Sequence, residues 1–280
     1  MIRIDTPRRL LFAPAVALAI LASAGSALAE RRELRVCADP NNLPFSNQRL
    51  EGFENKVAQL IADDLHATVT YTWHPQGRGF IRNTLKERRC DLVIGVPSGY
   101  DMVLATRPYY RSTYVFVYAK NRNLQLRSFD DPVLARLKIG LDEIGEDGAN
   151  TPPALTLARR GIVGNIVGFK MWDVDSVENP QGRIIDAVAS GDIDVAIVWG
   201  PLGGYFARRY RAALNVVPVS FTTARPVFPF VYDISMGVRS GDDALKRELE
   251  SVLDRRRGDI ERILEDYGVP LVAATAASQP

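Results

Sequence analysis

The chain has 280 residues, with 35 Lys or Arg against 33 Asp or Glu. Three of the basic residues and one acidic residue fall within residues 1–29, so the rest of the chain carries 32 charges of each sign and a formal net charge of zero. Proteins that bind nucleic acid usually carry a basic surface, so this balance argues against a nucleic-acid partner.

Residues 1–29 are predicted to be a secretory signal peptide. Three arginines precede an apolar run at residues 10–24, and Ala27-Leu-Ala29 is a small-residue cleavage site. The run is short for a helix that spans a bilayer, although an uncleaved anchor is the alternative. We therefore expect a periplasmic protein whose mature chain has no transmembrane segment. The sequence leaves open whether export follows the general or the twin-arginine route.

Two cysteines, Cys37 and Cys90, remain in the exported chain. An even number of cysteines in an oxidising compartment favours a disulfide. Closing this loop would stabilise the fold by roughly 4 kcal/mol in the chain-entropy treatment. Two buried thiols are the alternative, because the register of neighbouring strands could keep the two residues apart.

The first part of the mature chain alternates strands with helices. Apolar residues at helical spacing predict a helix over residues 54–66, and a second helix is predicted over 78–88. The predicted strands are residues 34–38, 68–73 and 91–95, followed by a Thr- and Tyr-rich strand at 112–119. This order implies right-handed crossovers and a parallel sheet.

A second α/β unit follows a polar break at residues 120–123. Its predicted strands are 138–141, 167–172, 194–198 and 216–219, and its predicted helices are 152–161, 183–189 and 202–213. A linker at 222–230 then leads to a strand at 234–238 and to helices at 242–256 and 258–267. The chain therefore crosses twice between two units, which is typical of a hinged protein.

Several short segments carry a resemblance to a known family. The start Leu34-Arg-Val-Cys-Ala-Asp39, then Pro44-Phe45 and Gly52-Phe53-Glu54, resemble the opening of periplasmic solute-binding proteins of the amino-acid-binding family, family 3. The segments CADPNNLPFS at 37–46 and RPYYRSTYVF at 107–116 are similar to one branch, the J proteins encoded beside quinoprotein methanol dehydrogenases. The resemblance covers most of the mature chain.

The resemblance implies an α/β fold of the two-lobed type II periplasmic binding protein class, with two α/β domains joined by a two-stranded hinge. We expect the following division: signal peptide 1–29, first lobe 30–119 together with 228–270, second lobe 120–227, and a flexible tail 271–280.

The residues that hold an amino acid in such proteins are missing here. Amino-acid binders of this fold place an Arg after the third strand, where it grips the substrate carboxylate, and an Asp at the end of a second-domain strand for the ammonium group. Residues 97–104 contain no Arg, Arg107 comes only ahead of Pro108, and the corresponding strand ends in Trp199. A zwitterion would lose both partners, so we expect no amino-acid binding.

The expected cleft is mainly apolar. Its predicted apolar lining is Leu43, Pro44, Phe45, Phe53, Phe80, Pro97, Tyr100, Tyr114, Trp199 and Phe230. The polar candidates are Asn41, Asn42, Glu54, Gln76, Arg78, Ser98 and Asp142. The alternatives left open are core positions for Phe53 and Phe80, a helix-start role for Glu54 and a loop-capping role for Arg78.

The resemblance alone implies the function, so this inference is associational. It implies an accessory protein of a system with a pyrroloquinoline-quinone (PQQ)-dependent methanol or alcohol dehydrogenase. The expected partner is the periplasmic quinoprotein dehydrogenase, with its c-type cytochrome as a further candidate. We expect a monomer with no catalytic residue, metal or cofactor. Whether the dehydrogenase depends on calcium or on a lanthanide stays open.

Two other functions remain as alternatives. The first is a substrate-binding protein of an ABC transporter for a small apolar or aromatic solute. The second is an enzyme of the dehydratase type that shares this fold, although the sequence places no convincing acid–base pair.

Overall fold

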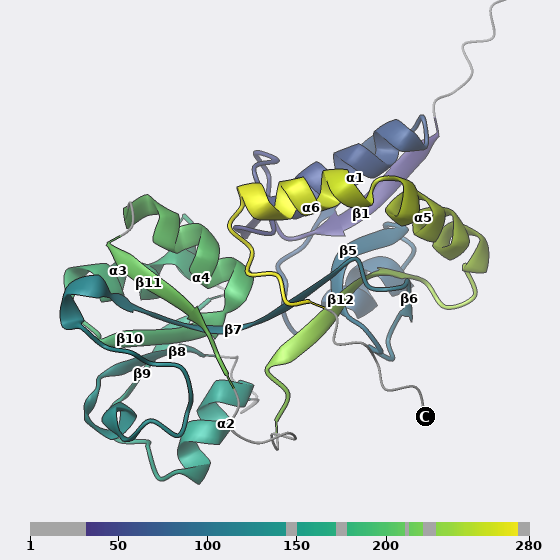
Figure 1. Cartoon of the computed structure of the whole chain (residues 1–280). Helices are drawn as coiled ribbons and strands as arrows, with labels where there is room; N and C mark the ends of the chain where they lie inside the picture. Colours follow the sequence, from purple (N-terminus) through teal and green to yellow (C-terminus); the bar gives the residue numbers. More distant parts are fainter. Residues whose placement is uncertain (1–31, 144–149, 172–177, 211–212, 221–227, 274–280) are drawn as a thin grey trace, which may run out of the picture. The chain divides into compact units, whose positions relative to one another are not determined.

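The computed structural model (Figure 1) describes residues 32–143, 150–171, 178–210, 213–220 and 228–273. The chain divides into two units, Met1–Glu30 and Arg31–Pro280, and the second unit is described below. The predicted signal peptide, most of the predicted linker and most of the predicted tail lie outside the described residues.

Three parallel strands form the centre of the first lobe. Strand β1 (Glu33–Ala38) lies between β4 (Thr68–Trp73) and β5 (Leu92–Pro97), and all three run parallel, as the sequence predicts. Helix α1 (Phe53–Asp64) forms the crossover from β1 to β4, and its apolar face is fully buried against the sheet. The spacing of buried Val57, Ala58 and Ile61 along this helix is the spacing seen in the sequence.

One predicted helix of this lobe is shorter than the sequence suggests. The prediction spans residues 78–88, but helical structure begins only at Phe80 and includes the π-helical turn Arg82–Lys86. Gly79 has a φ angle of 90°, in the left-handed region that a right-handed helix excludes. The apolar spacing is therefore correct, while the glycine delays the start of the helix.

The second lobe contains a mixed sheet. Strand β8 (Ile139–Glu143) pairs parallel with β9 (Ile166–Lys170) and with β10 (Val195–Trp199). Strand β11 (Leu214–Pro218) pairs antiparallel with β7 (Tyr110–Ala119). The helices of this lobe are α2 (Pro152–Arg159), α3 (Arg183–Ser190) and α4 (Gly200–Ala207).

Two antiparallel strands connect the lobes. The first residues of β7 pair with β12 (Val231–Val238), which in turn pairs with β5 of the first lobe. The remaining residues of β7, from Tyr114 onward, pair with β10 and β11 of the second lobe. The two-stranded hinge is thus the pair β7–β12 (Figure 1), and β7 itself belongs to both sheets. The exact domain bounds given above stay a prediction.

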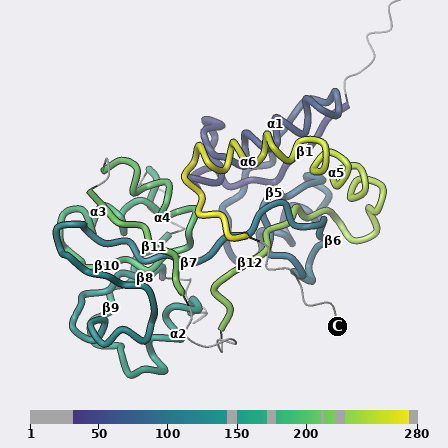
Figure 2. Tube along the Cα trace, in the orientation of Figure 1, coloured from purple at the N-terminus to yellow at the C-terminus, as the bar shows by residue number. Residues whose placement is uncertain are grey.

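The last helices of the chain return to the first lobe. Helix α5 (Asp243–Arg255) and helix α6 (Arg257–Asp266) share a hydrophobic core with α1, and Figure 2 shows α1 and α6 side by side. Three very short strands were not predicted: β2 (Asn41–Asn42), β3 (Ser46–Asn47) and β6 (Leu104–Ala105). Within the described residues, no helix has the length and apolar character needed to cross a membrane.

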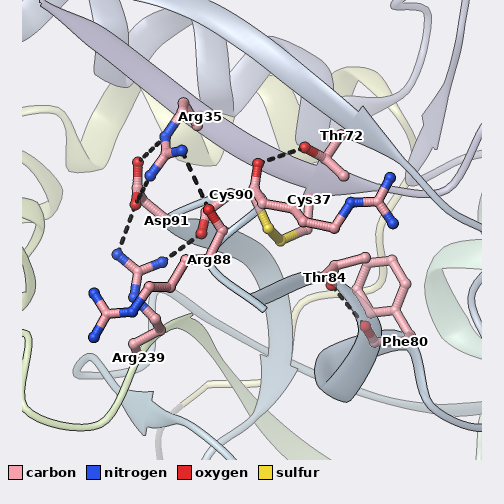
Figure 3. The surroundings of a disulfide bond; sticks show 10 residues. Arg35, Cys37, Thr72, Phe80, Thr84, Arg88, Cys90, Asp91 and Arg239 are labelled. Carbon is pink, nitrogen blue, oxygen red and sulfur yellow. Dashed lines mark hydrogen bonds and ion pairs between the residues drawn. A yellow bond between two sulfur atoms is a disulfide. The ribbon is translucent and has the colours of Figure 1, made fainter. Parts of the chain in front are cut away.

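A disulfide joins the first and third parallel strands (Figure 3). Cys37 lies in β1, Cys90 lies two residues before β5, and their Cα atoms are 5.5 Å apart. Both cysteines are buried. Next to the bridge, the Asp91 carboxylate accepts hydrogen bonds of 2.7 Å from Arg35 and from Arg239. The predicted bridge is therefore confirmed, and it lies beside an ion-pair network that ties β1 to the end of β12.

The bridge predicts the result of thiol labelling. Because both cysteines are buried, the protein must be denatured before it is labelled, and we expect almost no reactive thiol without a reductant. The reduced, denatured protein serves as the control and should give two thiols per chain. Two labelled thiols in the unreduced periplasmic protein would contradict the bridge.

Candidate functional site

A pocket of about 400 Å³ lies between the two lobes. Its walls come from the carboxyl ends of β5, β8 and β10 and from the hinge strands β7 and β12. Ligands of open α/β sheets bind at these strand ends, so the fold places the pocket where a ligand site is expected. The lining residues are Asn42, Phe45, Glu54, Gln76, Gly95, Val96, Pro97, Tyr110, Tyr114, Asp142, Thr151, Met171, Gln181, Trp199, Leu202, Tyr232 and Ile234.

Part of the predicted site comes together in this pocket. The residues predicted from the sequence that line it are Asn42, Phe45, Glu54, Gln76, Pro97, Tyr114, Asp142 and Trp199. They come from both lobes and from the hinge, so closure of the lobes is what assembles them. Their roles toward a ligand or a partner stay a prediction.

Four of the predicted apolar residues belong to the core instead. Leu43, Phe53, Phe80 and Phe230 are buried and lie outside the pocket lining. Phe53 shows why: as the first residue of α1 it packs its ring between Phe45 and Tyr110, whereas its neighbour Glu54 faces the pocket. The sequence shows that both residues open a helix, but not which way each one points.

The other residues predicted for the cleft also lie outside the pocket lining. Ser98 is exposed and shares a 2.6 Å hydrogen bond with Ser235 of β12. Tyr100 and Arg78 are exposed at the surface. Asn41 belongs to β2 and contacts the second lobe, and Pro44 lies in the turn between β2 and β3. A role of these residues toward a ligand or a partner stays a prediction.

Contacts between the lobes close one rim of the pocket. The side chain of Gln181 donates a 2.9 Å hydrogen bond to the backbone carbonyl of Asn41. The backbone N–H of Asn179 donates to the Asn41 side chain at 3.1 Å, and Arg49 forms an ion pair with Glu178. Residues 41–49 are therefore held against residues 178–181.

Aromatic rings form a continuous wall of the pocket. The Trp199 ring packs edge-to-face on Tyr114 at 5.5 Å and on Tyr232 at 5.7 Å between ring centroids. Trp199 ends β10, Tyr114 comes from β7 and Tyr232 from β12. The sequence identified Trp199 and Tyr114 but missed Tyr232 and Tyr110. Both missed tyrosines lie in the hinge strands, and only the pairing of these strands brings them to the pocket.

Two carboxyl groups face the pocket from opposite lobes. Burial raises the pKa of Glu54 to about 8, with a further contribution from the charge of Asp39. Burial also raises the pKa of Asp142 to about 7. The Glu54 carboxyl group lies over Gly95, where an added Cβ atom would come within 2.1 Å of Oε1. A glycine at the end of β5 thus makes room for the Glu54 carboxyl group.

No lysine or arginine lines the pocket in the part of the chain that the structure describes. An amino acid placed here would bring a carboxylate group next to Glu54 and Asp142 without a cation to pair with it. Burying an unpaired carboxylate costs several kcal/mol. The loss of the amino-acid clamp stays a prediction.

Comparison with known proteins places this fold in a family. Residues 34–270 match the family described as "Bacterial extracellular solute-binding proteins, family 3". The chain belongs to this family.

Individual members of the family are similar over nearly the whole chain. Protein MoxJ of Paracoccus denitrificans is 30% identical, covering 92% of this chain and 95% of MoxJ. The crystal structure of periplasmic binding protein XoxJ from Methylobacterium extorquens AM1 is 39% identical, with a TM-score of 0.70, over 86% of this chain and 100% of XoxJ. MxaJ from Methlophaga aminisulfidivorans MPT is 26% identical, with a TM-score of 0.75, over 85% of this chain and 100% of MxaJ. The predicted J-protein branch is thus confirmed.

The missing clamp predicts the response to amino acids. We expect no heat signal in calorimetric titrations of the mature protein with any of the common amino acids at millimolar concentration, because their carboxylate has no cationic partner in the pocket. Trp199→Asp alone should not restore binding, since it supplies an acceptor for the ammonium group only. An arginine-binding member of the family serves as the positive control. Micromolar binding of an ordinary amino acid would contradict this expectation.

Proposed function

We propose that this protein is a periplasmic, non-catalytic accessory factor of a PQQ-dependent methanol or alcohol dehydrogenase. The observation that carries the proposal is the combination of near full-length similarity to MoxJ and XoxJ with a pocket that has no amino-acid clamp. A transport receptor for amino acids would need that clamp. The J proteins, which the segments at 37–46 and 107–116 resemble, are encoded beside quinoprotein methanol dehydrogenases.

The hinge offers a way for a partner to act on this protein. A partner can shift the balance of open and closed lobes only if it binds the two states with different affinity. A segment of the dehydrogenase, or of its c-type cytochrome, that contacts both lobes near residues 41–49 and 178–181 would meet that condition. In this proposal the fold serves protein recognition, and the mature chain acts as a monomer.

A second candidate is a substrate-binding protein of an ABC transporter for a small apolar or aromatic solute. The pocket favours it, because its volume and aromatic wall suit a small molecule with a ring. The gene neighbourhood separates the two functions: a permease and an ATPase favour transport, whereas a dehydrogenase and a c-type cytochrome favour the accessory role.

Association with the dehydrogenase is the direct test. We expect the tagged mature protein to co-purify with a periplasmic quinoprotein dehydrogenase, and an arginine-binding family member with the same tag to recover none. Deletion of the gene should lower alcohol oxidation by whole cells, and the wild-type gene should restore it. Absence of association, together with normal alcohol oxidation in the deletion strain, would contradict the proposal.

A variant of the rim tests whether the closed arrangement matters for the partner. Asn41→Ala removes the side-chain oxygen that accepts from the Asn179 N–H and keeps the backbone carbonyl that accepts from Gln181. We expect a lower recovery of the dehydrogenase with this variant and no change with Asn121→Ala, which alters an exposed residue in the turn after β7. Equal recovery with both variants would show that the partner binds elsewhere.

A further inference from the structure

Two residues of the pocket lining carry a buried acceptor oxygen without a donor. In the described part of the chain, Asp142 Oδ1 and Gln181 Oε1 are buried and accept no hydrogen bond, and both residues line the pocket. A buried acceptor without a donor destabilises a protein, so two such acceptors in the lining of one pocket call for an explanation. A ligand that donates hydrogen bonds is the explanation that the rest of the pocket supports.

The amide of Gln181 can be oriented in one way only. Its Nε2 atom lies 2.9 Å from the carbonyl oxygen of Asn41 and 3.0 Å from that of Met171. Both carbonyls can only accept, so the amide nitrogen must face them and the oxygen must be the free end. Gln181 is 2% exposed, so its oxygen is an acceptor held in place by the rim contact.

Carboxyl oxygens add to this acceptor surface from both lobes. Asp142 stands at the end of β8 in the second lobe, and Glu54 stands in the first turn of α1 in the first lobe. No hydrogen bond or ion pair to the Glu54 carboxyl group is found among the described residues. Negative charge can therefore develop on two sides of the cavity, and no lysine or arginine of the described lining neutralises it.

The aromatic wall suits a cation for a separate reason. The faces of Trp, Tyr and Phe rings carry partial negative charge and attract an ammonium group, more strongly where water is excluded. Trp199, Tyr114 and Tyr232 supply such rings in mutual edge-to-face contact. They also provide an apolar surface for the body of a ligand.

We propose that this pocket binds a primary ammonium ion with an aromatic or alkyl body and no carboxylate group. The ammonium donates hydrogen bonds to the acceptor groups of Gln181, Asp142 and Glu54, and the body of the ligand packs on Trp199 and its neighbours. A primary amine fits better than a quaternary one because only the primary amine carries N–H donors. The site is independent of the accessory role, and either can fail without the other.

Binding of such a cation is coupled to pH. In the empty pocket, burial holds the pKa of Asp142 at about 7 and that of Glu54 at about 8. The other titratable groups near them are Asp39, Tyr71, Tyr109 and Tyr110 beside Glu54, and Tyr114 beside Asp142. The tyrosines stay neutral, because burial raises the pKa of each above its usual value. A bound cation favours both carboxylates, so it displaces protons and binds more tightly as the pH rises from about 6 to about 8.5.

Four probes of similar shape and different charge separate the contribution of charge to binding from that of apolar contact. They are phenethylammonium (a cation), 2-phenylethanol (neutral), 3-phenylpropionate (an anion) and L-phenylalanine (a zwitterion), titrated calorimetrically into the mature protein. We expect phenethylammonium to bind at least about tenfold more tightly than 2-phenylethanol, with the anion and the zwitterion weakest. The affinity for phenethylammonium should rise with pH, while the affinity for 2-phenylethanol stays constant.

Two conservative variants test the named atoms. Asp142→Asn and Glu54→Gln keep the side-chain shape and remove the charge. Each variant should lower the affinity for phenethylammonium by about tenfold or more and leave the affinity for 2-phenylethanol unchanged. Asp254→Asn, which alters an exposed carboxylate far from the pocket lining, is the matched control and should change neither probe. Thermal unfolding of each variant checks that the fold is intact.

Several outcomes would overturn the proposal. One is that the alcohol or the anion binds as tightly as phenethylammonium. Another is that neither phenethylammonium nor the aliphatic hexylammonium binds at millimolar concentration at pH 8.5. A third is that Asp142→Asn and Glu54→Gln bind the amine as tightly as the unmodified protein does.

Discussion

The pairing of β7 with β12 is the constraint on which the rest of the structure depends. One end of β7 pairs with β12 next to the first sheet, and the other end pairs with β10 and β11 in the second sheet. The lobes therefore share a strand, and motion between them has to occur about this pair. The same strands carry Tyr110, Tyr114 and Tyr232 into the pocket, so the hinge and the pocket wall are built from the same residues. A substitution in these strands would affect both closure and binding.

The polar groups of this pocket differ from those that hold the ligand in amino-acid binders of the same fold. Amino-acid binders of the fold pair a ligand carboxylate with Arg and a ligand ammonium group with Asp, whereas here Trp199 occupies the strand end and no cation lines the described pocket. The remaining polar groups are acceptors: the Gln181 amide oxygen and the carboxyl groups of Asp142 and Glu54. Keeping such groups buried lowers the stability of the closed, empty protein. This cost is reduced when a donor enters or when the lobes open.

The closed rim links the proposed accessory role to the pocket. Gln181 lines the pocket, holds Asn41 of the opposite lobe with its amide nitrogen, and leaves its amide oxygen without a donor. Anything that engages the oxygen therefore acts on a side chain that also holds the lobes together. A partner protein that contacts residues 41–49 and 178–181 together would act on the same contact from outside. A small cation and a protein partner could thus influence one another through a single residue, as linkage between two sites requires.

The sequence by itself determined the class of fold, and it predicted the loss of the amino-acid clamp. Strand–helix alternation, the two crossings and the even cysteine count can all be read from the sequence. The apolar spacing of α1 is also found in the structure, because this spacing determines which face of the helix is buried. Trp199 and Asp142 were found because strand ends are recognisable from the sequence. Only the tertiary structure decided that Phe53 turns into the core while Glu54 faces the pocket, and that Asn41 contacts the other lobe. It also brought in Gln181, which lies in no motif, since its role depends on two backbone carbonyls that only the closure of the lobes places beside it.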